Sequence, residues 1–266
     1  MAGVYAARFT IGGVCLLAGR VFVRRWPSIM VLCLAAGAAV SAFGFLAFLS
    51  PGAIMTKIIA APWPVLEITR GLVPSIIAGP VIALSLLALT KPSQPKRHAY
   101  VLVLRRLPAT SIAAMCMSLL ISEPARFAAG ALVSYHPGVQ LAAIVALFFY
   151  QIAMFAFGYL MVTVMVVESP DPWHALKRAI RLIHGRWIRV SLITLGLWVL
   201  IYAADQFGTS IALSIVLDSF WWASVIVSVS AAIRIATILV VIAAIYQLLR
   251  IERDGPLPQD AAEVFD

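Results

Sequence analysis

The chain has 266 residues, 63% of them hydrophobic and only 12% charged, and carries a net charge of +9. Soluble domains average about 45–50% apolar and ~25% charged residues, so this composition excludes a water-soluble globular protein and indicates an integral membrane protein. The basic residues adjoin apolar segments and form no basic domain of their own, which excludes nucleic acid as the expected partner and favours anionic lipid headgroups.

The chain begins with an amphipathic segment, residues 8–25, that is too polar to cross a bilayer and suits the membrane interface. Thr10 can cap its start, and Arg20 and Arg24 lie four residues apart on the side opposite the apolar residues. We call such a basic, amphipathic segment an elbow, because it leads directly into an apolar segment of membrane-spanning length, here residues 27–49.

Two more elbows are predicted further along the chain. The second, residues 91–106, comes after a charged, proline-containing connection at 51–70 and the span that follows it. The third has a clear start, because Asp171 can cap a helix and Pro172 suits its first turn. Apolar residues then recur at helical spacing and predict one apolar stripe, opposite Lys177, Arg178 and Arg181: Trp173, Leu176, Ile180 and Ile183.

The elbows alternate with pairs of apolar segments long enough to cross a bilayer. The third of these segments is interrupted by Glu123-Pro124-Ala125-Arg126. The predicted spans are residues 27–49, 71–89, 108–134, 141–167, 187–204 and 223–249. The polar segment 251–266 is expected to be a disordered tail.

Arg25, Arg106 and Arg186 occupy the same place in the three elbows, about 80 residues apart, and a bulky apolar residue follows each. A period this regular indicates one supersecondary unit repeated along the chain. We therefore predict an all-α, polytopic membrane bundle of six transmembrane helices, in a single integral membrane domain over residues 1–250. Its three repeats each comprise an interfacial elbow helix and a transmembrane hairpin, and cover about residues 8–90, 91–168 and 169–250.

Six spans would bring both termini to one side of the membrane. Most of the 20 Lys and Arg residues lie in the elbows or just after the last span, and therefore on this same side. Such an asymmetry is typical of cytoplasmic loops. The sequence therefore predicts a multi-pass protein of the bacterial inner membrane with both termini in the cytoplasm.

Basic residues of the elbows are the first candidate site, a contact with anionic headgroups at the cytoplasmic face. The simpler interpretation is topological, with positive charge that keeps the loops inside and touches headgroups without selectivity. The more specific one is a headgroup site between neighbouring elbows, where each basic residue contributes about 1 kcal/mol. We call these residues the basic collar: Arg24, Arg25, Arg105, Arg106, Lys177, Arg178, Arg181 and Arg186.

A second candidate is a group of charges inside the predicted spans, Glu123, Arg126 and Arg234. A charge at the centre of a span costs roughly 2.5–3.5 kcal/mol, so these residues are expected to pair or to line a polar cavity. The first expected partner of Arg234 is Glu123, and the next are Asp218 and Asp205. Glu123 and Arg126 can also pair with each other on one helix face.

Motifs for catalysis or for binding a metal or cofactor are not visible in the sequence. His174 and His184 lie ten residues apart, which does not match the spacing of two metal ligands on a helix. The three cysteines lie in apolar surroundings and read as small buried side chains. We therefore expect no enzymatic activity, no metal and no cofactor.

The segment VVESPDPWHALKRAIRLIHGRWIRVSLI, residues 166–193, resembles a broad bacterial group of six-span membrane proteins. The group includes the YciC-like inner-membrane proteins and the membrane region of some glycerophosphodiester phosphodiesterases. The opening FTIGGVCLLAGRVFVRRWPSIMVL is similar to the group's N-terminal elbow. This chain has Ala179 where serine is common, and it lacks a soluble phosphodiesterase domain. The resemblance thus implies a six-span fold and no hydrolytic activity.

The expected function is non-enzymatic: a scaffold, an accessory subunit or a lipid-associated factor in the inner membrane. Its expected partners are anionic membrane lipids, together with another membrane protein or a second copy of the chain. The alternative is a transporter or lipid-handling protein with a polar cavity near Glu123, Arg126 and Arg234.

Overall fold

The computed structural model describes residues 9–49, 63–90, 96–132, 136–216 and 220–254, and over these residues the chain is all-helical, with no strand. One helix is short, α6 (Pro172–Ile183), with 12 residues. The other six described helices are long: α1 (Ile11–Leu49), α3 (Trp63–Thr90), α4 (Lys96–Leu132), α5 (Pro137–Val167), α7 (Trp187–Val216) and α8 (Phe220–Asp254).

The long helices are sufficient in length to cross a bilayer. Even α3, with 28 residues, is about 42 Å long at 1.5 Å per residue, whereas the hydrocarbon core is about 30 Å thick. Among the described residues, three segments are also apolar enough to cross a membrane: Ile11–Ala38, Gly138–Val167 and Ser228–Asp254. The structure therefore agrees with an integral membrane protein.

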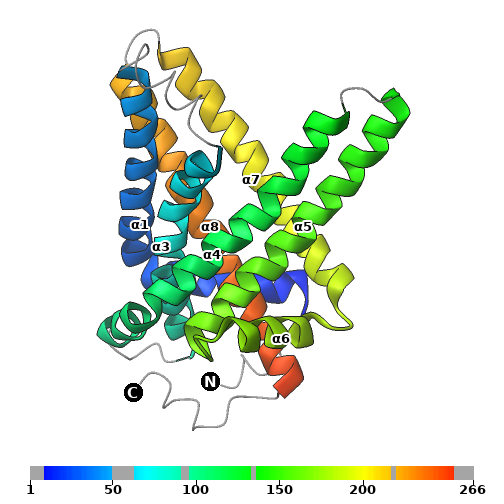
Figure 1. Cartoon of the computed structure of the whole chain (residues 1–266). Coiled ribbons are helices and arrows are strands. Elements are labelled where there is room, and N and C mark those ends of the chain that lie inside the picture. The colour runs from blue at the N-terminus through cyan, green and yellow to red at the C-terminus, as the bar shows by residue number, and fades with distance from the viewer. Residues whose placement is uncertain (1–8, 50–62, 91–95, 133–135, 217–219, 255–266) are drawn as a thin grey trace.

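The six long helices run between two ends of a bundle, and α6 lies across one of them (Figure 1). We call this end the basic end; α3, α5 and α8 finish there. Helix α1 packs most extensively on α8, and α3 packs on α4. The α4–α5 hairpin leans away from α1 and α8 toward the opposite end (Figure 1).

The tightest part of the core lies at the basic end. Each of α3, α5 and α8 buries a continuous run of eight residues there, namely 81–88, 160–167 and 242–249. A helical segment that is buried on all sides is expected to have an unbroken apolar sequence. These three segments are apolar except for an occasional Ser, Thr, Tyr or Gln. The second long helix of each predicted repeat is thus the one that fills the centre of the bundle.

Only the third elbow forms a separate helix. In the first and second elbows the helix continues into the long segment that follows, through Pro27 in α1 and Pro108 in α4. The third is broken at Gly185, whose φ of 79° is strained for residues with a Cβ. The residues at the corresponding positions of the first two elbows, Arg24 and Arg105, have a Cβ, and their backbone is helical. The first turns of α1, the darkest blue in Figure 1, still cross the basic end before the helix rises.

Several helix boundaries differ from those predicted. Helix α3 begins at Trp63, inside the segment expected to be a connection, and α7 continues to Val216. Helix α4 continues past Pro124 to Leu132, although an interruption was expected there. A proline removes one backbone donor, but the flanking turns retain theirs, and helix is the way to satisfy backbone groups away from water.

The C-terminal segment also differs from expectation. Helix α8 continues to Asp254, four residues into the predicted tail, and residues 255–266 lie outside the described part of the chain. Carboxylates in these last turns bind arginines of the third elbow, as described below, and this binding explains why the polar segment remains helical.

Candidate functional site

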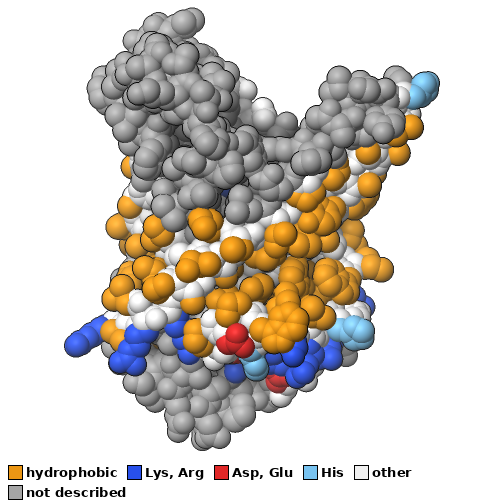
Figure 2. Space-filling model, in the orientation of Figure 1, with side chains coloured by type: hydrophobic (Ala, Val, Ile, Leu, Met, Phe, Trp, Pro, Cys, Tyr) orange, Lys and Arg blue, Asp and Glu red, His pale blue; other side chains and the backbone are white. Residues whose placement is uncertain are grey.

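Basic and apolar side chains separate into two adjacent bands on the surface. Figure 2 shows Lys and Arg gathered at the basic end and a broad band of hydrophobic side chains directly above them. Exposed large hydrophobic side chains occur on all six of the long helices, among them Val31, Ile76, Leu104, Ile144, Phe149, Leu200 and Val225. An apolar band bordered by Lys and Arg is the surface expected of a protein at a membrane–water interface.

Arginines of the first two elbows bind the carboxyl ends of helices. The Arg24 guanidinium donates from Nη1 to the carbonyl oxygen of Ala88, near the end of α3 (2.9 Å). Arg106 Nη1 donates to the carbonyls of Val166 (3.0 Å) and Met165 (3.3 Å), at the end of α5. The last four carbonyls of a helix have no hydrogen-bond donor within the helix, and they form the negative end of its dipole. An arginine there donates hydrogen bonds to these carbonyls and places a positive charge at the negative end.

The third elbow makes an equivalent contact through a carboxylate. Arg186 Nη2 lies 3.0 Å from Oε1 of Glu252, near the end of α8. The first two contacts join residues 64 and 60 apart in sequence, and the third has a similar separation. Each predicted repeat therefore has an elbow arginine bound to the end of its own second helix. In the first repeat this is Arg24, one residue before the aligned Arg25.

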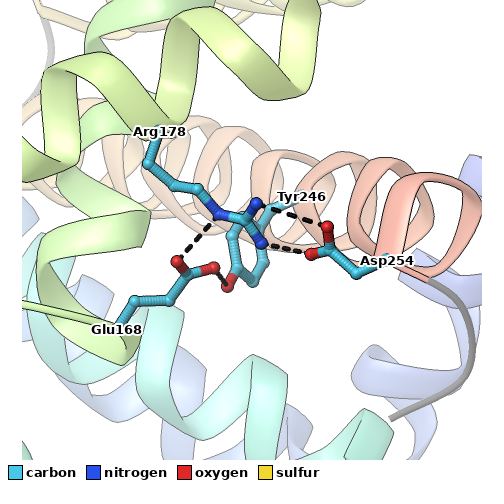
Figure 3. A network of polar contacts seen from close by, with 4 residues as sticks. All are labelled: Glu168, Arg178, Tyr246 and Asp254. Atoms are coloured by element: carbon cyan, nitrogen blue, oxygen red, sulfur yellow. Dashed lines mark hydrogen bonds and ion pairs between the residues drawn. The ribbon is translucent and has the colours of Figure 1, made fainter.

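A four-residue polar network joins the C-terminal parts of α5 and α8 to the middle of α6 (Figure 3). Glu168 caps the C-terminus of α5, and its carboxylate accepts from Arg178 Nε (2.9 Å) and from the Tyr246 hydroxyl (2.7 Å). Arg178 also forms an ion pair with Asp254. Burial lowers the pKa of Arg178, but hydrogen bonds to Asp254 and Glu168 outweigh it and raise the pKa above its ordinary value. The guanidinium therefore stays charged at every physiological pH.

The network holds α6 against α5 and α8 in a defined orientation. Asp171 caps α6 as predicted, since its carboxylate accepts from the backbone N–H of Trp173 and of His174. The predicted apolar stripe is divided in the structure, because Trp173 is 61% and Ile180 46% exposed, whereas Ile183 is buried. The buried face of α6 consists of Ala175, Ala179, Leu182 and Ile183.

Helix α6 therefore has three faces, of which two look outward. One outward face is apolar, with Trp173 and Ile180, and the other is basic, with Lys177 and Arg181. The two meet where Lys177 Nζ lies 5.0 Å from the centre of the Trp173 ring. An exposed tryptophan beside lysine and arginine is typical of a helix lying at headgroup level.

The basic collar thus divides into two groups. Arg106, Arg178 and Arg186 are half-buried, and together with Arg24 they bind helix ends or carboxylates as described above. Arg25 is half-buried on α1. The exposed residues that remain to face the surroundings are Arg105, Lys177 and Arg181.

The charges predicted inside the spans are described only in part. Glu123 and Arg126 belong to α4, but their side chains lie outside the described part of the chain, as do those of Asp205 and Asp218. Arg234 is half-buried on α8, within electrostatic range of Tyr159 on α5. The pairing of Arg234 with Glu123 remains a prediction.

Sequence reasoning missed the acidic half of the site. No role was expected for Glu168, Tyr246, Glu252 or Asp254. The available signal was charge: acidic residues follow the fourth and sixth predicted spans, on the side where the elbows place their arginines.

No group of three or more His, Cys, Asp or Glu side chains that could hold a metal ion occurs among the described residues. The chain matches no protein-family model, no curated protein and no solved structure. Its function has to be argued from its own geometry.

Replacing Arg106 with alanine is expected to lower the free energy of unfolding by about 1–2 kcal/mol. The change leaves two carbonyls at the end of α5 without their charged donor, and such bonds contribute about 1.5–3 kcal/mol when fully buried. The neighbouring Arg105→Ala is a matched control, since Arg105 is exposed and should change stability by less than about 0.5 kcal/mol. Denaturant unfolding in detergent measures both, and equal losses would contradict the helix-end role.

Proposed function

We propose that the chain is a non-enzymatic, multi-pass protein of the bacterial inner membrane that acts as a lipid-associated scaffold or accessory subunit. Its outward-facing collar residues, Arg105, Lys177 and Arg181, associate with anionic headgroups of the cytoplasmic leaflet. The observation that carries this proposal is the basic band directly beside an apolar surface at one end of the bundle (Figure 2). Such an arrangement places cations at headgroup depth when the apolar band is in lipid.

Six spans in three repeats follow from the same proposal. Each of the long helices has one of its ends at the basic end of the bundle (Figure 1). Apolar stretches in Ile76–Thr90 and Trp187–Leu197 add to the three segments already long and apolar enough to cross. The three elbow arginines bound to the ends of α3, α5 and α8 support a repeated unit. With this topology, both termini lie at the cytoplasmic face, and the resemblance of residues 166–193 to six-span proteins agrees with it.

The outward-facing collar residues attract anionic headgroups through their charge, and not by forming a pocket for one headgroup. Each Lys or Arg near an anionic leaflet contributes about 1 kcal/mol, and this attraction is screened by salt. Because Trp173 and Ile180 form an exposed apolar face of α6 beside its basic face, α6 can insert its apolar side while its cations stay in the headgroups.

The test is lipid selectivity in vesicles of phosphatidylcholine and phosphatidylglycerol, measured by quenching of tryptophan fluorescence with brominated lipid. The wild type should prefer phosphatidylglycerol. The triple variant Arg105→Gln, Lys177→Gln, Arg181→Gln should lose about tenfold or more of this preference, and added salt should weaken it in the wild type.

A variant that keeps the charge serves as the control. Arg105→Lys with Arg181→Lys should retain the preference, because the proposal needs positive charge and not guanidinium geometry. A wild type without preference for the anionic lipid, or a triple variant that keeps it, would contradict the proposal.

A further inference from the structure

A cavity of about 440 Å³ lies at the basic end of the bundle. It is formed by the start of α1, the first two turns of α7 and the last turns of α8, with Ile11, Arg189 and Glu252 among its lining residues. Its volume falls in the range of ordinary small-ligand sites, about 300–1,000 Å³. None of its lining residues belongs to the basic collar or to the Glu168–Arg178 network, although Glu252 contacts the collar through Arg186.

The lining of the cavity includes one basic and one acidic side chain, Arg189 and Glu252. Glu252 on its wall already forms an ion pair with Arg186 at 3.0 Å. Arg189, one turn further along α7, is exposed and has no ion pair among the described residues. One guanidinium at the cavity is therefore left to bind an anion, and planar guanidinium groups match the oxygens of phosphate well.

Apart from Thr10, the remaining walls are apolar and start next to this charge. Leu192 and Ile193 follow Arg189 by one turn of α7, on the way into the apolar band. On the α1 side, Ile11 is 64% exposed, and Leu192 opposite is 58% exposed. A water-soluble anion would leave these side chains in water, whereas a hydrocarbon chain would cover them at roughly 25 cal/mol per Å² of buried apolar area.

We propose that this cavity binds a single anionic phospholipid, with its phosphate on Arg189 and an acyl chain along Leu192 and Ile193. The inference rests on the proposed membrane location, and it adds a site for one lipid to the unspecific attraction of the collar. The occupant would bridge the first and third predicted repeats, since α1 supplies one wall and α7 and α8 supply the others.

The experiment is native mass spectrometry of the purified full chain in detergent, with phosphatidylglycerol titrated against phosphatidylcholine. The wild type should retain one phosphatidylglycerol. Arg189→Gln should weaken this retention by roughly five- to tenfold, the loss of one basic contact and its hydrogen bonds. Ile11→Trp should weaken it to a similar extent without any change of charge, because the indole fills the cavity from an exposed position.

Arg97→Gln is the matched control, because it removes one exposed arginine from the first turn of α4, and Arg97 neither belongs to the basic collar nor lines the cavity. It should leave the retained lipid unchanged within about twofold. Equal losses in Arg97→Gln and Arg189→Gln, or full retention in Ile11→Trp, would overturn the cavity site.

Two further outcomes separate the possible failures. If the collar triple variant loses its lipid preference while Arg189→Gln and Ile11→Trp bind as the wild type does, the cavity site is wrong and the proposed function stands. If the wild type shows no preference for anionic lipid at all, both are wrong. Competition by glycerol phosphate as strong as that by phosphatidylglycerol would overturn the assignment to a lipid, because it would mean that the apolar walls contribute nothing.

Discussion

Replacing Gly37 with alanine is expected to destabilise the bundle by about 2–3 kcal/mol, because one added methyl group would push α1 away from α8. A Cβ at Gly37 would lie 2.4 Å from the backbone oxygen of Ser228 and 3.4 Å from the backbone nitrogen of Ala232. Backbone atoms cannot rotate out of the way as a side chain can, so the helices must separate along a packed interface.

The matched control is Gly196→Ala, since a Cβ at this helical glycine meets nothing within 4 Å. Alanine there should be neutral or stabilise the helix by about 0.5–1 kcal/mol, as expected from helix propensity. Thermal unfolding in detergent, followed by circular dichroism, compares the two variants. A Gly37→Ala protein as stable as Gly196→Ala would show that α1 and α8 do not approach as described.

Replacing Arg178 with alanine is expected to lower the free energy of unfolding by about 2–3 kcal/mol. The change leaves Glu168 and Asp254 without the cation between them, and both sit at helix C-termini, where the helix dipole already disfavours negative charge. Breaking a fully buried pair costs about 3–5 kcal/mol. The side chains of Arg178 and Glu168 are 16% and 18% exposed, so water reduces this cost.

Two comparisons make the test specific to the network. Lys177→Ala, the exposed neighbour, should cost less than about 1 kcal/mol, because it loses only the contact with the Trp173 ring. Tyr246→Phe should cost about 1–2 kcal/mol, because it removes one buried hydrogen bond to Glu168. The double variant Glu168→Gln, Arg178→Ala should cost less than the sum of its parts. An Arg178→Ala variant no weaker than Lys177→Ala would contradict the network.

Local signals in the sequence predicted local structure well. The all-helical class is confirmed, and so are the caps at Thr10 and Asp171, where the hydroxyl accepts from Gly13 and the carboxylate from Trp173 and His174. These features depend on residues within one helical turn of each other, so spacing alone is enough to find them. Positions of proline were less informative, because the helix continues through Pro27, Pro108 and Pro124.

The contacts that define the candidate site could not be predicted from spacing, because they join residues that are far apart in the sequence. Arg106 and Val166 are 60 residues apart, and Tyr246 and Glu168 are 78 apart. Which helix end meets which elbow depends on how the helices pack, and no spacing rule links them. Charge patterning predicts that the elbow arginines share one side of a membrane. In the structure they lie at the basic end, and packing divides them into those that bind helix ends or carboxylates and those that face outward.

The burial of α5 changes along its length, and this has a consequence for how the protein responds to its bilayer. The half near the basic end is enclosed, whereas Leu141, Ile144 and Phe149 in the other half are 65%, 58% and 59% exposed. In that half, the Tyr150 hydroxyl donates to the carbonyl of Leu120 and ties α5 to α4. In the membrane proposed here, a change in hydrocarbon thickness is therefore met by tilting of this hairpin, while the collar keeps its shape.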